Sequence, residues 1–252
     1  MRYFIIVCCF LFACTSGSRK LVWSDEFEYS GQPHNAFWNY QIGDGCPNLC
    51  GWGNNEQQLY TKDSSNVRIE NGKLVIEAMK KDSVWTSARL TTKDKMNFTY
   101  GRIEFRAKLP TGIGTWPALW MLGEQVDIIG WPACGEMDVL EHVGRNPGVI
   151  QSALHSKSSS GDTVNKGDTH VETFDSDFHV YGANWLSDKI EFFVDDKIFY
   201  VYQPETFNEE TWPFQHPFYV IINIAMGGGL GGPIDPALTR ARMEVDYVRV
   251  YE

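Results

Sequence analysis

Basic residues are scarce in this sequence of 252 residues. Lys and Arg number 22 against 32 Asp and Glu, which gives a formal net charge of −10 at pH 7. This surplus of negative charge repels a phosphate backbone, and no basic stripe offsets it. The 23 Gly and 11 Pro are too few and too scattered for a collagen-like or disordered chain. The composition argues against a nucleic-acid-binding protein and favours a globular one.

The apolar run at the N-terminus is too short to span a bilayer. Residues 3–13 follow Met1-Arg2 and have the length of the apolar region of a signal peptide, whereas a membrane span needs about 20 residues. Leu11-Phe12-Ala13-Cys14 resembles a bacterial lipobox, in which Cys14 is acylated. Because Phe12 is larger than the usual residue there, a plain secretory cleavage nearby is the alternative. We predict an exported protein with a signal peptide at 1–13, a short tether at 14–20 and one folded domain at 21–252.

Cysteine is also sparse in the predicted domain. Cys46 and Cys50 lie in a loop rich in Gly, Pro and Asn, where a short bridge between them could hold the turn. Cys134 would then be an unpaired, buried thiol. No second Cys or His pair stands at zinc-ligand spacing, and no G-x-S-x-G motif occurs. The sequence therefore supports neither metal-dependent catalysis nor a serine esterase.

Aromatic residues, by contrast, are abundant. They make up 14% of the chain and include nine Trp. Proteins use exposed aromatic faces to stack on sugar rings or on nucleobases. Since the net charge disfavours nucleic acid, a carbohydrate ligand is the better hypothesis.

Short alternating segments separated by turn residues make up the rest of the chain. Residues 68–78 alternate around an Asn71-Gly72 turn, which predicts a hairpin. A turn or two of helix is predicted only near Glu205–Glu209. Many strands of this kind predict an all-β antiparallel sandwich whose first and last strands are neighbours. The further predicted strands are residues 21–28, 100–109, 177–185, 189–195, 198–202 and 244–251.

Three carboxylates stand close together in one of these segments. Glu136 and Asp138 alternate with apolar residues and so point to one face of a strand, whereas strict alternation would turn Glu141 to the other face. One β-bulge at Val139-Leu140 returns Glu141 to the side of the other two. Acids crowded on one face acquire unequal pKa values, as acid–base chemistry requires.

Two carboxylates that flank a scissile bond, one as nucleophile and one as acid/base, are the arrangement of a retaining glycosidase. In this reading Asp138 lies between them and orients the nucleophile. An exposed acidic strand or a calcium cluster would give the same spacing, so the spacing alone leaves these alternatives open.

The segment Glu136–Glu141 resembles the bulged ExDxxE signature of glycoside hydrolase family 16, in its laminarinase-like form. Lichenase-type members carry the shorter ExDxE. The similarity covers nearly the whole predicted domain and includes residues 21–27 (LVWSDEF), 51–56 (GWGNNE), 87–91 (SARLT), 101–110 (GRIEFRAKLP), 114–123 (GTWPALWMLG), 131–136 (WPACGE) and 245–251 (VDYVRVY).

The resemblance implies a concanavalin A-like β-jelly-roll sandwich with a concave substrate cleft, and it implies roles for individual residues. Glu136 would be the nucleophile, Asp138 its partner and Glu141 the general acid/base. Trp131 would be a platform for a glucosyl ring. The other implied substrate-binding residues are Trp116, Asn54, Asn55, Arg89 and His155; His155 is expected to face Glu141, or else to be a structural histidine. Trp120 should share the face of Trp116 or lie in the core.

The resemblance also implies the partners. The activity expected is retaining endo-hydrolysis of laminarin-like β-1,3-glucan, and of mixed-linkage β-1,3-1,4-glucan as well, by a monomer with no catalytic cofactor. A structural calcium ion would lie away from the cleft at Glu26, the Gly72 carbonyl and Asp246, which all offer oxygen. The alternatives are a family 16 enzyme acting on a galactan and a non-catalytic glucan-binding lectin, which would need the Trp residues but not both Glu136 and Glu141.

Overall fold

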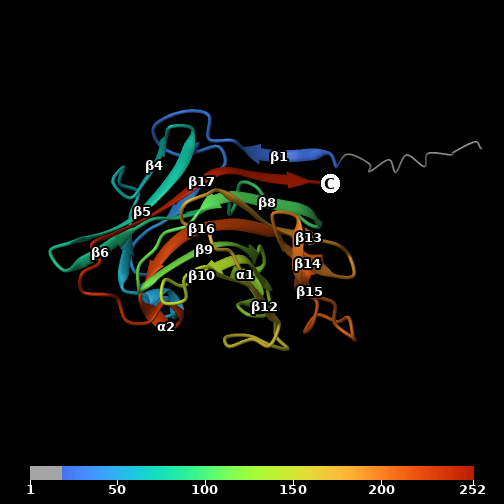
Figure 1. Cartoon of the computed structure of the whole chain (residues 1–252). Helices are drawn as coiled ribbons and strands as arrows, with labels where there is room; N and C mark the ends of the chain where they lie inside the picture. The colour runs from blue at the N-terminus through green and yellow to red at the C-terminus, as the bar shows by residue number, and fades with distance from the viewer. Residues whose placement is uncertain (1–18) are drawn as a thin grey trace, which may run out of the picture.

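Two β-sheets packed face to face form this protein (Figure 1). The structure is a computed structural model that describes residues 19–252, so the predicted signal peptide and Cys14 lie outside the described residues. One sheet has ten strands and the other seven, and every pairing is antiparallel except that of β3 with β6. The predicted all-β antiparallel sandwich is confirmed.

The ten-stranded sheet runs in the order β15 (Lys197–Tyr202), β14 (Ile190–Val194), β13 (His179–Trp185), β8 (Gly101–Lys108), β17 (Arg240–Tyr251), β5 (Lys73–Lys81), β6 (Val84–Ser87) and β3 (Gln58–Tyr60), with β1 (Leu21–Asp25) on β17 and β4 (Val67–Glu70) on β5. The seven-stranded sheet runs β12 (Lys166–His170), β11 (Val149–His155), β10 (Glu136–His142), β9 (Thr115–Gly123), β16 (Phe218–Met226), β7 (Arg89–Thr91) and β2 (Asn39–Gln41). Within residues 19–252 the protein also has four short helices: η1 (Cys50–Gly53), α1 (Val126–Ile129), η2 (Pro213–Gln215) and α2 (Gly228–Gly231).

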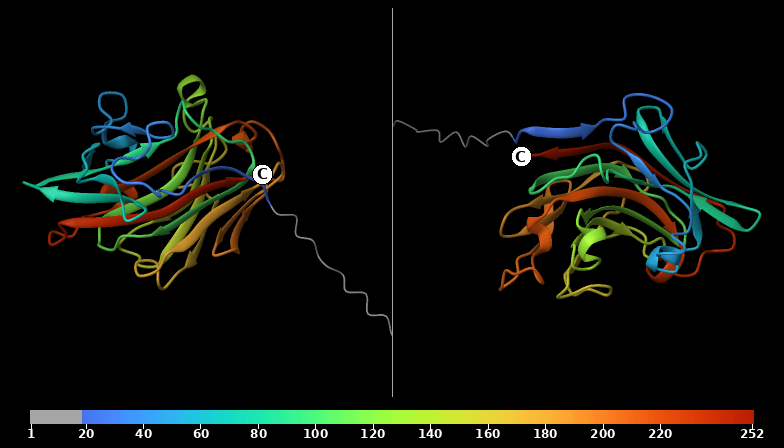
Figure 2. Two further views of the ribbon diagram at one scale, coloured as in Figure 1. Left: turned by 90° about the horizontal axis from the view of Figure 1, so that it is seen from above. Right: turned by 180° about the vertical axis from the view of Figure 1, so that it is seen from behind.

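The core lies between the two sheets. Alternate residues of the central strands enter it, for example Leu119 and Met121 of β9 and Phe105 of β8, all buried in one large cluster. The views of Figure 2 show both layers bent in the same direction, with the seven-stranded sheet on the inner side of the bend. We call the face of this sheet that points away from the core the open face.

Most local predictions agree with the structure. β1 pairs with β17, so the first and last strands are neighbours, and β4 and β5 form the hairpin at Asn71-Gly72. Both turn residues have positive φ, 55° and 69°, which suits Asn and Gly. Cys46 and Cys50 form a disulfide, and Cys134 is a free, buried thiol, as predicted.

The helix predicted near Glu205–Glu209 is wrong, because that segment consists of bends and turns. The side chain of Asn208 accepts hydrogen bonds from the backbone N–H groups of Glu210 and Thr211 at 2.8 and 3.1 Å. Such local bonds offer the backbone an alternative to the helix. None of the helices within residues 19–252, each of four residues or fewer, has the length and hydrophobicity of a membrane span.

Candidate active site

Strand β10 presents the three predicted acids on the open face. Its apolar residues Met137, Val139 and Leu140 are all buried in the core cluster, with at most 1% of each exposed. Because side chains of a strand alternate between its two faces, Glu136 and Asp138 point the other way. β10 is therefore amphipathic, with an apolar face in the core and an acidic face opposite.

A β-bulge brings Glu141 to the same face. Asp138 pairs with Ala153 of β11 and Glu141 with Gln151, so three residue steps on β10 match two on β11. The pairing with β9 shows the same extra residue between Asp138 and Leu140. The bulge predicted at Val139-Leu140 is confirmed, and it has the expected effect of absorbing one residue.

Each of the two outer acids accepts a hydrogen bond from a tryptophan. The indole N–H of Trp131 donates to Glu136 Oε2 at 2.6 Å, and that of Trp116 donates to Glu141 Oε1 at 2.9 Å. Trp131 is 48% exposed, as a platform for a ligand would be, while Trp116 is half-buried. The structure thus brings both predicted tryptophans to the acids, and their N–H groups orient the two carboxylates.

Burial dominates the electrostatics of the three acids. It raises the pKa of Glu136 to about 8 and that of Glu141 to about 7, and it raises the pKa of Asp138 well above its usual value. The charge of Asp138 adds to the effect on Glu136, while His155, Trp131 and Arg89 oppose it. Three buried carboxylates so close together therefore keep at least one proton near neutral pH.

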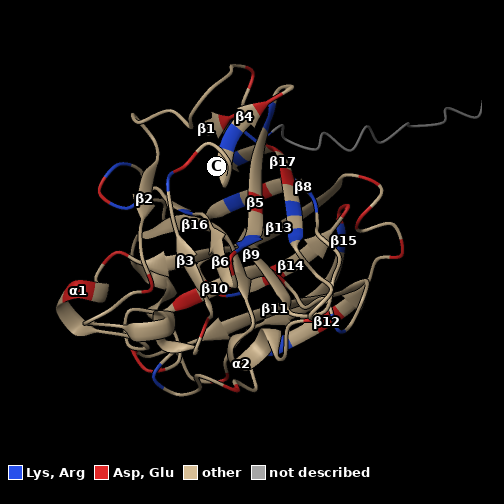
Figure 3. Cartoon of the chain, turned by 90° about the vertical axis from the view of Figure 1, so that its left-hand side faces the viewer, with Lys and Arg blue, Asp and Glu red and all other residues tan. Residues whose placement is uncertain are grey.

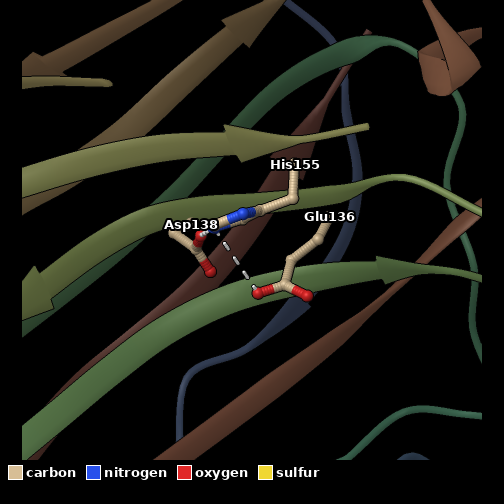
Figure 4. Close-up of side chains that lie close together, drawn as sticks. All are labelled: Glu136, Asp138 and His155. Carbon is tan, nitrogen blue, oxygen red and sulfur yellow. Dashed lines mark ion pairs between the residues drawn. The ribbon is translucent and has the colours of Figure 1, made fainter. Parts of the chain in front are cut away.

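His155 lies against Asp138 rather than against Glu141. It pairs with Glu136 across β10 and β11, and its Nε2 is 3.0 Å from Asp138 Oδ2 and 4.0 Å from Glu136 Oε1 (Figure 4). The expectation that His155 faces Glu141 is wrong, because the register places Gln151 opposite Glu141. One donor atom from each of Glu136, Asp138 and His155 lies within 4.8 Å of the others.

Arg89 occupies a different part of the open face. Its guanidinium carbon is 4.6 Å from the ring centre of Trp52 and 4.9 Å from that of Trp120, so the cation lies between two aromatic faces. The side chain is buried, and its Nε has no hydrogen-bond partner within residues 19–252. Trp120 shares the face of Trp116, as predicted, and lies outside the cluster between the sheets. Trp52 was not predicted, although its ring covers Arg89.

A chain of hydrogen bonds holds this aromatic group in place. The Trp120 indole donates to Asn223 Oδ1 at 2.8 Å, Asn223 Nδ2 donates to Tyr60 Oη at 3.1 Å, and Tyr60 donates to Glu56 at 3.0 Å. Glu56 also accepts a bond from Gln58 at 2.7 Å. Asn223 interrupts the mainly apolar sequence of β16. This polar residue is the feature of the sequence from which a buried hydrogen-bond network could have been predicted.

Asn54 and Asn55 lie in the exposed loop between η1 and β3. Asn54 donates to Glu56 at 3.4 Å, and its carbonyl accepts the backbone N–H of Gly229 in α2 at 2.8 Å. This loop is therefore joined to the Gly-rich helix α2 and to the hydrogen-bond chain of Glu56. Within residues 19–252, neither Asn54 nor Asn55 forms a hydrogen bond with the three acids.

The residues predicted to hold calcium meet on the ten-stranded sheet. Glu26, Gly72 and Asp246 all line one surface cavity of about 570 Å³. Arg249 donates to both carboxylate oxygens of Glu26 at 2.9 and 2.8 Å. Arg106 and Lys73 approach the two oxygens of Asp246 at 2.5 and 3.2 Å. The oxygen donors converge, but cations already pair with both carboxylates.

Comparison with known proteins adds independent information. The model of the family described as "Glycosyl hydrolases family 16" matches residues 54–249. A β-glucanase from Rhodothermus marinus is 44% identical over 247 residues, which cover 92% of this chain and 85% of that protein. The laminarinase from Flavobacterium sp. UMI-01 has a solved structure with 47% identity and a TM-score of 0.89, covering 92% of this chain and all of that one.

A further solved structure contains a ligand. It is a mutant of SCLam, described as a non-specific endo-β-1,3(4)-glucanase, and it presents 1,3-β-D-cellobiosyl-glucose at its active site. The two chains are 37% identical with a TM-score of 0.86, and the similarity covers 94% of this chain and 95% of SCLam.

Proposed function

Because the chain belongs to glycosyl hydrolase family 16, we propose that it is a retaining endo-β-glucanase acting on laminarin-like β-1,3-glucan, with mixed-linkage β-1,3-1,4-glucan as a second substrate. The observation that carries this proposal is the set of three acids on one open face, two of them bonded to indole N–H groups. A lectin would have no need for both Glu136 and Glu141. The activity in the name of SCLam supports the second substrate.

In the first step, Glu136 attacks the anomeric carbon of the glucosyl unit, and the bond to the leaving oxygen breaks. Glu141 gives its proton to that oxygen, so the departing chain leaves as a neutral alcohol. A pKa of about 7 keeps a large share of Glu141 protonated near neutral pH. In the second step, Glu141 takes a proton from water, which attacks the anomeric carbon and releases Glu136.

Asp138 holds the proton that Glu136 must lack. It is only 3% exposed, less than either glutamate, so the free energy needed to ionise it is the largest. Once Asp138 is neutral, its charge no longer adds to the effect of burial on the pKa of Glu136, while His155, the Trp131 N–H and Arg89 favour the ionised form. A neutral Asp138 thereby makes ionisation of the nucleophile easier.

Substrate binding uses the aromatic surface and the polar groups beside it. The exposed ring of Trp131 stacks on the glucosyl unit held next to Glu136. Arg89, with its unpaired Nε, and the exposed Asn54 and Asn55 bind sugar hydroxyls farther along the chain. His155 acts on substrate only through Asp138 and Glu136.

The test is to measure reducing sugar released from laminarin, mixed-linkage glucan and a galactan, with NMR of fresh products. We expect laminarin to be the best substrate and the β-anomer to appear first. Glu136→Ala should lose activity and regain it with azide as an α-glycosyl azide, whereas Glu141→Ala should give a β-azide on activated aryl glycosides. An α-anomer appearing first would exclude double displacement.

We also propose a structural calcium ion at the cavity of Glu26, Gly72 and Asp246. Because Arg249, Arg106 and Lys73 neutralise the carboxylates, the ion must rely on carbonyl oxygens and share Asp246, and we expect weak binding. Calcium should raise the melting temperature progressively with its concentration, and EDTA should leave the activity unchanged. A melting temperature that is independent of calcium would remove this proposal.

The localisation and the oligomeric state are further proposals. The pattern that ends at Cys14 supports a lipid-anchored, exported protein, and the Cys46–Cys50 disulfide suits an oxidising compartment. We propose that the protein works as a monomer, with the lipid as its only membrane attachment. Cys14→Ser should release the protein from the membrane fraction, and light scattering of the soluble form should give the mass of one chain.

A further inference from the structure

The nucleophile belongs to a group of atoms that could bind a metal ion. Glu136, Asp138 and His155 each direct one donor atom toward the same point, and these atoms lie within 4.8 Å of one another. Figure 4 shows the three side chains pointing toward each other from β10 and β11. Two carboxylates and one imidazole are a set that favours zinc or copper over calcium or magnesium.

The spacing of the donor atoms is close to that of a zinc site. Zinc bonds of about 2.0–2.2 Å in a tetrahedral arrangement place ligand atoms roughly 3.3–3.6 Å apart. His155 Nε2 lies 3.0 Å from Asp138 Oδ2 and 4.0 Å from Glu136 Oε1, which brackets this value.

Two of these side chains lack hydrogen bonds where a ligand would satisfy them. Asp138 is 97% buried, and within residues 19–252 its Oδ2 accepts no well-directed hydrogen bond, although His155 Nε2 lies 3.0 Å away. Glu136 uses Oε2 for the Trp131 indole, so Oε1, the oxygen nearer His155, remains available. Each residue can therefore supply one ligand atom without breaking the bond from Trp131.

The local charge favours a cation. In the part of the chain that the structure describes, no lysine or arginine forms an ion pair with Glu136, Asp138 or Glu141. A divalent ion would neutralise the repulsion among these buried carboxylates. His155 Nδ1 has no hydrogen-bond partner among residues 19–252, whereas strong zinc sites brace that nitrogen. This points to a reversible site rather than a permanent one.

We propose that Glu136, Asp138 and His155 bind a divalent transition-metal ion of the zinc type, and that the bound ion inhibits hydrolysis by occupying the nucleophile. Three protein ligands leave one coordination position open toward the substrate side. Binding of the ion stands on the geometry alone, whereas inhibition rests on the proposed function, in which Glu136 attacks the sugar. Substrate and ion then exclude each other.

The first experiment is calorimetric titration of the purified protein with zinc chloride. We expect one ion per chain, and at least tenfold weaker binding in both His155→Gln and Asp138→Asn. His179→Gln is the matched control, because His179 pairs with the carboxylate of Asp195 at 2.6 Å and, within residues 19–252, belongs to no group of three metal-ligating side chains. Magnesium chloride should give no binding. Unchanged zinc affinity in folded His155→Gln and Asp138→Asn would overturn the site.

The second experiment follows laminarin hydrolysis at several zinc concentrations. Zinc should raise KM and leave kcat unchanged, and EDTA should restore the activity. If zinc binds as predicted but does not affect hydrolysis, inhibition through the nucleophile is wrong. Absence of activity on every glucan in zinc-free buffer would instead contradict the proposed function, while the titration would still decide the metal site.

Discussion

At the scale of single residues, two indole N–H groups organise the reacting carboxylates. Trp131 and Trp116 come from different parts of the chain, yet each donates to one of the two outer acids. A bond to the charged form of a carboxylate stabilises that form and orients it. These tryptophans therefore orient the reacting carboxylates in addition to binding sugar.

The two roles of Trp131 can be separated by substitution. Trp131→Phe keeps an aromatic face but removes the N–H, so we expect kcat to fall with a small change in KM. Trp131→Ala removes both, and kcat/KM on laminarin should fall by the equivalent of about 1–3 kcal/mol. Because the side chain is 48% exposed, melting temperatures should stay within a few degrees. A large loss of stability with normal kinetics would contradict this assignment.

The buried acids also reduce stability at high pH. The folded-state pKa of Glu136, about 8, lies above the unfolded value of 4.5. Below pH 4.5 the group costs nothing, because it is protonated in both states; as the pH rises toward 8, the folded state loses stability. Glu136→Gln should therefore stabilise the protein at pH 8 by on the order of 1–3 kcal/mol, and have little effect at pH 4.5.

Thermal unfolding at the two pH values measures this effect. The melting temperature should rise by roughly 2–4 °C for each kcal/mol added to the free energy of unfolding. Glu172→Gln, at an exposed position, serves as the control and should show no such difference between pH 4.5 and pH 8. If Glu136→Gln changed the melting temperature equally at both pH values, burial of the charged carboxylate would not be the cause of the stabilisation.

At the scale of elements, the bulge in β10 accommodates one more residue between Asp138 and Glu141 than regular strand pairing allows. Without Val139, Asp138 would still pair with Ala153 and Glu141 with Gln151, because the bulge contains one residue more than the partner strand. Leu140 would then be the single core residue between the two acids. The bulge is thus compatible with the catalytic register rather than required for it.

Deletion of Val139 tests this directly. We expect a folded protein that retains measurable laminarin hydrolysis, less stable by about 1–3 kcal/mol because a fully buried valine is lost. Deletion of both Val139 and Leu140 should abolish activity, since it turns Glu141 toward the core. Val139→Ala controls for the loss of core packing. A Val139 deletion that folds but is as inactive as Glu141→Gln would show that the bulge itself places the acid.

At the scale of the whole molecule, charged residues pair with one another on the outer surface, while the titratable side chain of His142 is buried between the sheets. Basic and acidic residues alternate on the outer surface of the ten-stranded sheet (Figure 3), where Glu244 contacts both Lys108 and Arg242 at 2.9 and 2.7 Å. Surface pairs of this kind, whose side chains are partly exposed, contribute little each. Between the sheets, His142 packs against Phe174 with ring centres 4.7 Å apart, and neither nitrogen has a partner among residues 19–252.

This buried histidine should make the fold sensitive to acid. Burial lowers the pKa of His142 to about 4, below the unfolded value of 6.5. Between these values the unfolded chain binds the extra proton, so stability is complete above pH 6.5 and is lost as the pH falls toward 4. The loss should be about 2–3 kcal/mol, and His142→Leu should remove it, whereas the exposed His170→Leu should not. Denaturant unfolding from pH 7 to pH 4 measures the difference.

Short-range sequence patterns were sufficient to predict much of the fold and the arrangement of the three acids. The alternation in β10, the extra residue in its bulge and the Asn71-Gly72 turn depend on the period of the strand and on local backbone conformation, which neighbouring residues determine. Glu136, Asp138 and Glu141 could be placed on one face for this reason. The sandwich followed from many such segments and from the family resemblance.

Tertiary structure decided which distant residues meet. The register of β11 against β10 puts His155 beside Asp138, and the packing of a loop over β7 puts Trp52 on Arg89, which the sequence did not indicate. The bond from Trp116 to Glu141 depends in the same way on strand order, because β9 lies beside β10. Such contacts join residues that are distant in the sequence, so their partners are specified by the packing of all the strands. The face of a strand to which a side chain points, and the conformation of a turn, are specified by a few neighbouring residues.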